Sequence, residues 1–277
     1  MIKSIQEWYS KQPHLPDNYL ENHMIIQHLI STKFSAEKVK DKIDACLSVK
    51  HKMPEYLSNR DPMDSKIDYC LRFGFIVPLP KKTIDNHRVT ILRIKTPSEF
   101  IVADIAKLAL MILDYRARND VSLGDQWIHD FKNLSFQNSV QLTPTLVTKI
   151  IYYIRFCYGT SIKGLLFVNT PPYVTPIINL VKKLLSPKIA ERVKIYNSFD
   201  ELYKIFDKSI FPVEYGGDEI SCDEISENWT KALQTDAWRN YFAEQEKVLS
   251  DESKRTRYLS YDDFFGCEGS FRKLEFD

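Results

Sequence analysis

Long apolar runs are missing from this 277-residue sequence. No stretch approaches the roughly 18 consecutive apolar residues of a membrane-spanning helix, so we expect no such helix. The first residues, MIKSIQEWYS, contain no apolar run of signal-peptide length. Both absences lead us to expect a soluble, cytoplasmic protein.

Cysteine and histidine are also scarce. The five cysteines are odd in number and far apart, whereas disulfide frameworks and zinc clusters have paired or close spacing. His23 and His28 are five residues apart, which places them on different faces of a helix. A metal site on a helix requires two ligands at i and i+4, so this pair does not indicate one. We therefore expect reduced thiols and neither a metal ion nor a cofactor.

The common catalytic and nucleotide-binding motifs are absent as well. The sequence contains neither GxGxxG nor the GxSxG turn of α/β-hydrolases. Gly159 and Gly164 have the separation found in a P-loop, but Leu165 occupies the position of the essential lysine. We do not expect an enzyme; a hydrolase remains an alternative, which turnover abolished by substituting His129 or Asp130 would support.

The composition is that of a globular protein, with 44% hydrophobic and 27% charged residues. The net charge of +1 hides an asymmetry: residues 200–277 contain 10 basic and 19 acidic residues, whereas the first 199 contain 28 and 18. A basic front part can contact anionic lipid or nucleic acid, but scattered solvated charges need no partner.

Residues 1–75 show helical spacing and no strand-like alternation, which predicts an N-terminal helical domain. Asp17 and Asn18 are expected to cap one helix and Ser35 the next. Pro78 and Pro80 then indicate a linker.

Strands and helices alternate in the central part, which we assign to residues 76–217. Thr143-Pro144 and Thr175-Pro176 each combine an N-cap with proline at the first helical position. This alternation predicts an α/β fold with a mixed, largely parallel sheet flanked by helices. The expected strands are 88–94, 126–131, 162–168 and 193–196. Residues 218–277 are acidic and irregular, and we expect a tail packed on the domain with one helix near 229–248.

His129 is a histidine within an expected buried strand. It can be a core residue that hydrogen-bonds to a backbone carbonyl, or a polar contact inside a ligand pocket. The adjacent Asp130 has no acid or base partner at a recognisable spacing, so a structural role is expected.

Several segments resemble the sequence motifs of one known protein family and occur in the same order as in that family. Residues 163–171, KGLLFVNTP, resemble a strand and turn written "-GI-FIN-P-", and residues 184–193, LLSPKIAERV, resemble "FLS-K--ERI". Residues 211–217, FPVEYGG, are similar to "LP-EYGG", and residues 265–274 resemble the tails of one branch. Together these segments resemble the CRAL-TRIO lipid-transfer family, in the branch of tocopherol transfer and retinaldehyde-binding proteins.

The resemblance implies a carrier that buries one lipophilic molecule between its sheet and flanking helices. Residues 172–185 would form a mobile gate over this cavity. Burial of an apolar ligand is favourable by about 25 cal/mol per Å² removed from water. The implied wall and gate residues are Leu108, Met111, Ile128, His129, Ile150, Tyr153, Ile154, Tyr158, Ile162, Leu165, Ile177, Ile178, Val181 and Leu185.

The resemblance also implies a basic cleft for a phosphoinositide headgroup. The family's basic positions fall on Ser161, Lys163, Lys188 and Arg192, so a cation is missing at the first. The family's "LLRFLRARKF" reads IIQHLISTKF at residues 25–34, without any of its arginines.

We therefore expect a small hydrophobic ligand, transient contact with an anionic membrane surface and no nucleic acid. The ligand is expected to be tocopherol-, retinoid- or carotenoid-like. The alternative is a phosphoinositide-recruited membrane or protein interaction module without a stable cavity ligand. An interaction with a partner that requires residues 218–277 would favour this alternative.

Overall fold

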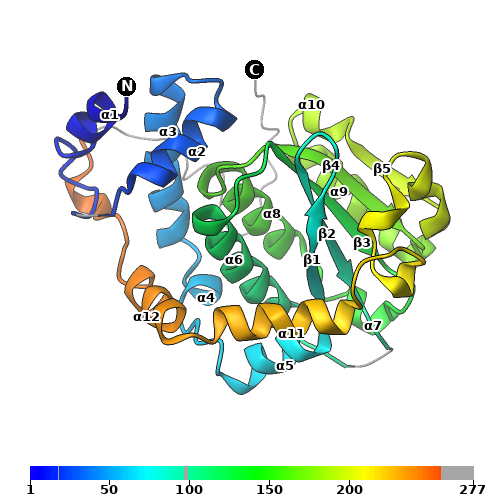
Figure 1. Ribbon diagram of the computed structural model, residues 1–277. Coiled ribbons are helices and arrows are strands. Elements are labelled where there is room, and N and C mark those ends of the chain that lie inside the picture. The colour runs from blue at the N-terminus through cyan, green and yellow to red at the C-terminus, as the bar shows by residue number, and fades with distance from the viewer. Residues whose placement is uncertain (18, 97–98, 257–277) are drawn as a thin grey trace.

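A five-stranded sheet forms the centre of the computed structural model, which describes residues 1–17, 19–96 and 99–256 (Figure 1). The first strand pairs antiparallel with the second, and the other neighbours are parallel. This architecture confirms the expected α/β fold with a mixed, largely parallel sheet. In sheet order the strands are β1 (Ile76–Lys82), β2 (His87–Arg93), β3 (Gly124–Asp130), β4 (Ile162–Val168) and β5 (Val193–Tyr196).

Strand β1 corrects the expectation of a linker around Pro78 and Pro80. Proline has no N–H to donate and is confined to edge strands or bulges within sheets. Strand β1 lies at the sheet edge, and its pairing with β2 becomes irregular between Pro78 and Lys82. Two prolines are therefore compatible with a strand at this edge.

Helices form the N-terminal part, as expected. Ser35 caps its helix by accepting a hydrogen bond from the Lys38 N–H. The expected cap at Asp17 is wrong, because the helix there begins later and is preceded by Glu21; Asn18 lies outside the described residues. The helices are α1 (Ile2–Tyr9), α2 (Asn22–Ser31), α3 (Ala36–His51), α4 (Pro54–Leu57) and α5 (Ser65–Phe73).

The helices between the strands include the two expected Thr-Pro starts. Thr143 caps α8 by accepting from the Leu146 N–H, as expected. Thr175 does not act as a cap: a 3₁₀ turn over Pro172–Val174 continues into α9, and Thr175 is the first helical residue. These helices are α6 (Val102–Asn119), α7 (Phe136–Ser139), α8 (Pro144–Tyr152), α9 (Thr175–Leu184) and α10 (Pro187–Ala190), and a π-helical turn (Tyr153–Cys157) extends α8.

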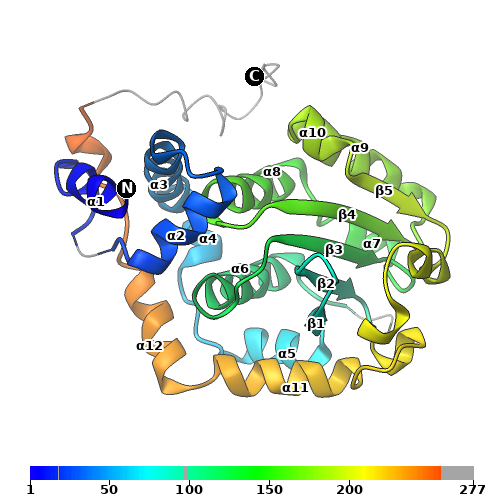
Figure 2. The same ribbon diagram turned by 45° about the horizontal axis from the view of Figure 1, so that its top comes forward.

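The C-terminal part is more regular than expected, since its described residues, 218–256, contain two α-helices where one was expected. Helix α11 (Cys222–Leu233) lies beside α5, and α12 (Asp236–Gln245) continues toward the N-terminal helices (Figures 1 and 2). Short 3₁₀ turns occur at Phe199–Lys204, Lys208–Ile210, Val213–Tyr215 and Glu252–Lys254.

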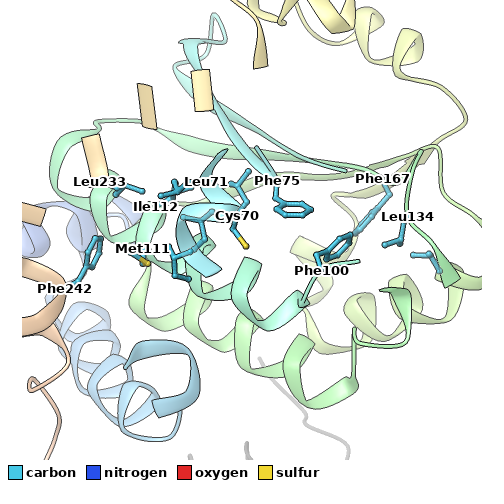
Figure 3. Close-up of a cluster of buried hydrophobic side chains, with 14 of the residues drawn as sticks. Cys70, Leu71, Phe75, Phe100, Met111, Ile112, Leu134, Phe167, Leu233 and Phe242 are labelled. Carbon is cyan, nitrogen blue, oxygen red and sulfur yellow. The ribbon is translucent and has the colours of Figure 1, made fainter. Parts of the chain in front are cut away.

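The two faces of the sheet carry different layers, because side chains alternate along each strand. Ile91, Ile128 and Leu166 point to one face and pack against residues 199–225. Helices α6, α8 and α9 cover the other face. A core cluster on that side extends from Leu233 and Phe242 of the C-terminal helices to Phe167 of β4 (Figure 3).

Candidate functional site

A cavity of about 350 Å³ lies between the sheet and helices α6, α8 and α9. Alternate residues of three parallel strands form its floor, among them Leu92, His129 and Phe167. Nearly all of its walls are aliphatic or aromatic. This combination of a partly open cavity, apolar walls and few polar groups is typical of small-molecule sites in proteins.

The cavity includes part of the expected wall. Strands β3 and β4 supply the floor positions, and the π-helical turn and α9 supply side walls. Their contact with a ligand stays a prediction. The expected residues that line the cavity are His129, Ile150, Ile154, Ile162, Leu165, Ile177, Val181 and Leu185.

Other expected wall residues lie elsewhere. Ile128 points to the opposite face of the sheet, because it neighbours His129 in the strand. Tyr153 donates its hydroxyl hydrogen bond to Asp114, and Tyr158 lies beside the Arg116 guanidinium, 5.8 Å from its ring centroid. Both therefore contact the C-terminal part of α6 and do not line the cavity.

Leu108, Met111 and Ile178 also lie outside the cavity, in the adjoining core. Met111 lies near Phe242, at the end of the cluster remote from Phe167 (Figure 3). Each of the three was assigned to the wrong side of its helix, because an apolar residue does not indicate by its type whether it faces core or cavity.

Helix α6 supplies wall residues that were not expected, among them Ile105 and Ala109, spaced i, i+4 on one face. Phe131 and Phe167 were also missed. They follow His129 and Leu165 by two residues, so strand alternation was the signal that could have found them.

Helix α9 covers the cavity along one face. Ile177, Val181 and Leu184 line it at i, i+4 and i+7 spacing, whereas Asn179 and Lys183 are exposed on the outer face. Ile178 is the fully buried residue of this helix and packs into the core. Most of the inward-facing apolar side chains of α9 thus border the cavity and do not pack against core residues.

His129 is the most unusual floor residue. Its ring stacks on Phe167 with the centroids 4.8 Å apart and the planes at 20°. Burial lowers the pKa of His129 to about 4, so the imidazole is neutral at physiological pH. Neither ring nitrogen has a hydrogen-bond partner among the described residues. Within these residues, His129 is therefore not a core histidine that bonds to a backbone carbonyl, which was one of the two interpretations of the sequence.

Asp130 and Arg93 also border the cavity, but other protein groups engage their polar atoms. Asp130 accepts hydrogen bonds from the Asn169 side-chain amide at 2.8 Å and the Tyr215 hydroxyl at 2.9 Å. Arg93 pairs with Asp223 at 2.8 Å. Asp130, the last residue of β3, thus links the segment after β4 to the turn at Val213–Tyr215, in agreement with its expected structural role.

The expected headgroup residues lie around the end of β4. Lys188 is exposed on α10, and the Arg192 guanidinium donates a hydrogen bond to the Ile162 carbonyl. Burial, first of all, and the charges of Lys163 and Arg192 lower the pKa of His87. Arg192 therefore has a structural contact, whereas Lys188 is open to solvent.

Among the described residues, no helix has the length and apolar character needed to cross a membrane. The same residues contain no group of three or more His, Cys, Asp or Glu side chains arranged to hold a metal ion.

Known proteins resemble this chain over most or part of its length. The alpha-tocopherol transfer protein-like protein of Mus musculus is 22% identical over 232 residues, which cover 82% of this chain and 67% of that protein. Clavesin-1 of Rattus norvegicus is 29% identical over 91 residues, or 32% of this chain and 26% of that protein. The crystal structure of Sfh5 matches with a TM-score of 0.55 and 12% identity, covering 88% of this chain and 92% of that one, which shows a shared fold.

Family models match two adjacent parts of the sequence. Residues 1–67 match the Pinta-like UBA domain, and residues 72–217 match the CRAL/TRIO domain. The second match covers more than half of the chain and includes the whole sheet and the cavity. The chain belongs to the CRAL/TRIO domain family.

Proposed function

We propose that the protein binds one small lipophilic molecule in this cavity and carries it, with α9 as the gate through which the ligand passes. Membership of the CRAL/TRIO family supports lipid binding or transfer in general. The observation that carries the proposal is the apolar cavity between the sheet and the helices, which α9 lines on one side. Tocopherol-, retinoid- and carotenoid-like molecules fit this description.

We infer carriage and not catalysis from the state of the polar groups at the cavity. Asp130 is engaged by Asn169 and Tyr215, which leaves it poorly placed to act as an acid or base. His129 stacks on Phe167 and has no acidic partner that would orient or activate it among the residues described. Binding of a ligand is the chemistry that such a lining supports.

Filling the cavity tests the proposal directly. Ala109 lies on the cavity face of α6, so Ala109→Phe is expected to occupy the space of the ligand. An organic extract of the purified variant should then contain far less bound lipophile than an extract of the wild type, as measured by mass spectrometry. Ala243→Phe, at an exposed position on α12, is the control and should retain the ligand. Equal ligand content in all three proteins would contradict the proposal.

A membrane-recruited module is the second candidate, and one charge pattern favours membrane contact. Residues 131–190 contain seven Lys or Arg and no Asp or Glu, and they include the gate helix and much of the cavity wall. Such a segment is attracted to anionic lipid, by about 1 kcal/mol for each basic residue near the surface. Membrane contact at the gate is compatible with carriage.

Lys163→Ala with Lys188→Ala tests whether phosphoinositide contributes. The pair avoids Arg192, whose guanidinium bonds the Ile162 carbonyl. Sedimentation with phosphoinositide liposomes should fall several-fold if the cleft binds a headgroup. The control Lys231→Ala with Lys247→Ala, exposed on α11 and just after α12, should have little effect. An equal loss in both double variants would indicate nonspecific attraction only.

A further inference from the structure

The position of His129 is central to the cavity floor. In the sheet register it lies between Leu92 of β2 and Phe167 of β4, which also line the cavity. Its ring stacks on Phe167 and lies 6.0 Å from the ring of Phe131, measured between centroids. The protein encloses the imidazole on its other sides, so the accessible part of the ring opens into the cavity.

The imidazole offers two unused hydrogen-bonding atoms at this point. A neutral histidine carries one N–H donor and one acceptor nitrogen. Burial lowers the pKa of His129 to about 4, so the neutral form prevails under physiological conditions. Within the ranges that the structure describes, neither nitrogen has a hydrogen-bond partner.

Such a residue has no advantage for folding. An imidazole that faces an apolar cavity without a hydrogen-bond partner does not stabilise the folded state, and an apolar side chain would suit the same lining better. The residues around it, Leu92, Leu165 and Phe167, are apolar, and the bordering Asp130 is hydrogen-bonded to other protein groups. A ligand group is therefore the partner that gives His129 a role.

We propose that His129 anchors one neutral hydrogen-bonding group, a hydroxyl or a carbonyl, on an otherwise apolar ligand. This inference rests on the proposed function and specifies its ligand class. A plain hydrocarbon would leave the imidazole unsatisfied. A carboxylate would lose its hydration in the apolar cavity and would receive only one N–H from a neutral imidazole.

In a competing arrangement, the ligand carries an acidic group, and Arg155 instead of His129 binds it. Arg155 also lines the cavity, and its guanidinium lies 5.1 Å from the centroid of the Phe156 ring. A ligand held there would be selected for negative charge, whereas a ligand held at His129 would be selected for an uncharged polar group. Probes that differ only in this group separate the two.

The test compares geranylgeraniol, geranylgeranic acid and the hydrocarbon of the same carbon skeleton. Dissociation constants are measured by quenching of intrinsic fluorescence for wild type, His129→Phe and His129→Gln. One satisfied hydrogen bond in place of an unsatisfied one corresponds to roughly a five- to tenfold preference for the alcohol over the hydrocarbon in wild type. His129→Phe should abolish this preference while it still binds the hydrocarbon, and His129→Gln should keep part of it.

A matched control is His28→Phe, which removes a buried histidine of α2 that does not line the cavity. It should bind all probes as wild type does, and thermal melts establish that each variant is folded. Equal binding of alcohol and hydrocarbon by wild type, an unchanged preference in His129→Phe, or tightest binding of the acid would overturn the anchor. If wild type binds none of the three, the proposed function itself fails, and the anchor fails with it.

Discussion

At the residue scale, His129 combines three properties: it lies half-buried on the cavity floor, its imidazole is neutral at physiological pH, and neither ring nitrogen has a hydrogen-bond partner among the described residues. Burial of an unsatisfied polar group costs about 1–3 kcal/mol. On our proposal, a hydrogen bond from the ligand to His129 offsets a cost of this kind.

The depressed pKa of His129 predicts how the ligand-free stability depends on pH. The unfolded chain binds a proton at His129 below about pH 6.5, but the folded protein does so only below about pH 4. The contribution of this residue to the free energy of unfolding is thus fully present above pH 6.5 and is lost as the pH falls toward 4, by roughly 3 kcal/mol at most.

Urea denaturation of wild type and His129→Phe between pH 7.5 and pH 4.5 measures this contribution. The free energy of unfolding of wild type should fall more steeply than that of the variant. His28, whose pKa burial also lowers, is present in both proteins, so the difference isolates His129. Parallel pH profiles would show that the imidazole is exposed to solvent in the folded state.

The sequence predicted the cavity residues with uneven success for a physical reason. Among the residues that the family resemblance implied, His129, Leu165, Ile177 and Val181 line the cavity, and their contact with a ligand stays a prediction. Met111 and Ile178 were misplaced, since an apolar side chain is equally stable against core atoms and against a cavity that holds a lipid.

At the scale of elements, α9 is held in place by very little core contact. Ile178 anchors it in the core, and the residues facing inward meet the cavity. Elements with few buried contacts open more readily than the rest of a fold. The small number of buried contacts is therefore compatible with the proposed role of α9 as a gate.

Ile178→Ala should loosen the gate without removing the cavity. Loss of a buried isoleucine side chain costs about 2–5 kcal/mol where the site cannot collapse. Hydrogen exchange over residues 175–184 should therefore accelerate, and a bound lipophile should leave several-fold faster. Asn179→Ala, on the exposed side of the same helix, should change neither rate. Equal exchange in both variants would mean that α9 does not open through this contact.

The boundaries of helices and strands could be predicted where a capping residue or turn signal coincided with the end of the apolar pattern. They could not be predicted elsewhere. Strands β4 and β5 occur at the expected residues, and Thr143 caps α8. Strand β1 was missed because Pro78 argues against a central strand, and the sequence does not reveal that the strand lies at an edge.

At the scale of the whole molecule, the C-terminal segment joins distant parts of the chain. Helix α11 packs on α5, and Arg239 of α12 pairs with Asp61 at 3.0 Å. Farther along, Arg255 pairs with Asp44 of α3 at 2.8 Å. Residues 222–256 are thus part of the fold and connect the sheet domain with the N-terminal helices.

Leu233→Ala tests this structural role. Leu233 is fully buried at the end of α11, within the cluster that reaches the cavity floor. The free energy of unfolding in urea should fall by about 2–5 kcal/mol. Lys231→Ala, two residues earlier and exposed, should change it by less than about 0.5 kcal/mol. A small effect of Leu233→Ala would indicate that the C-terminal helices are dispensable and free to serve a partner.

The most direct test of lipophile carriage is mass spectrometry of an organic extract from the natively purified protein. Our account predicts one neutral lipophile at close to equimolar amount, with a hydroxyl or carbonyl group. An empty extract, together with no thermal shift across tocopherols, retinoids, carotenoids and phospholipids, would contradict it.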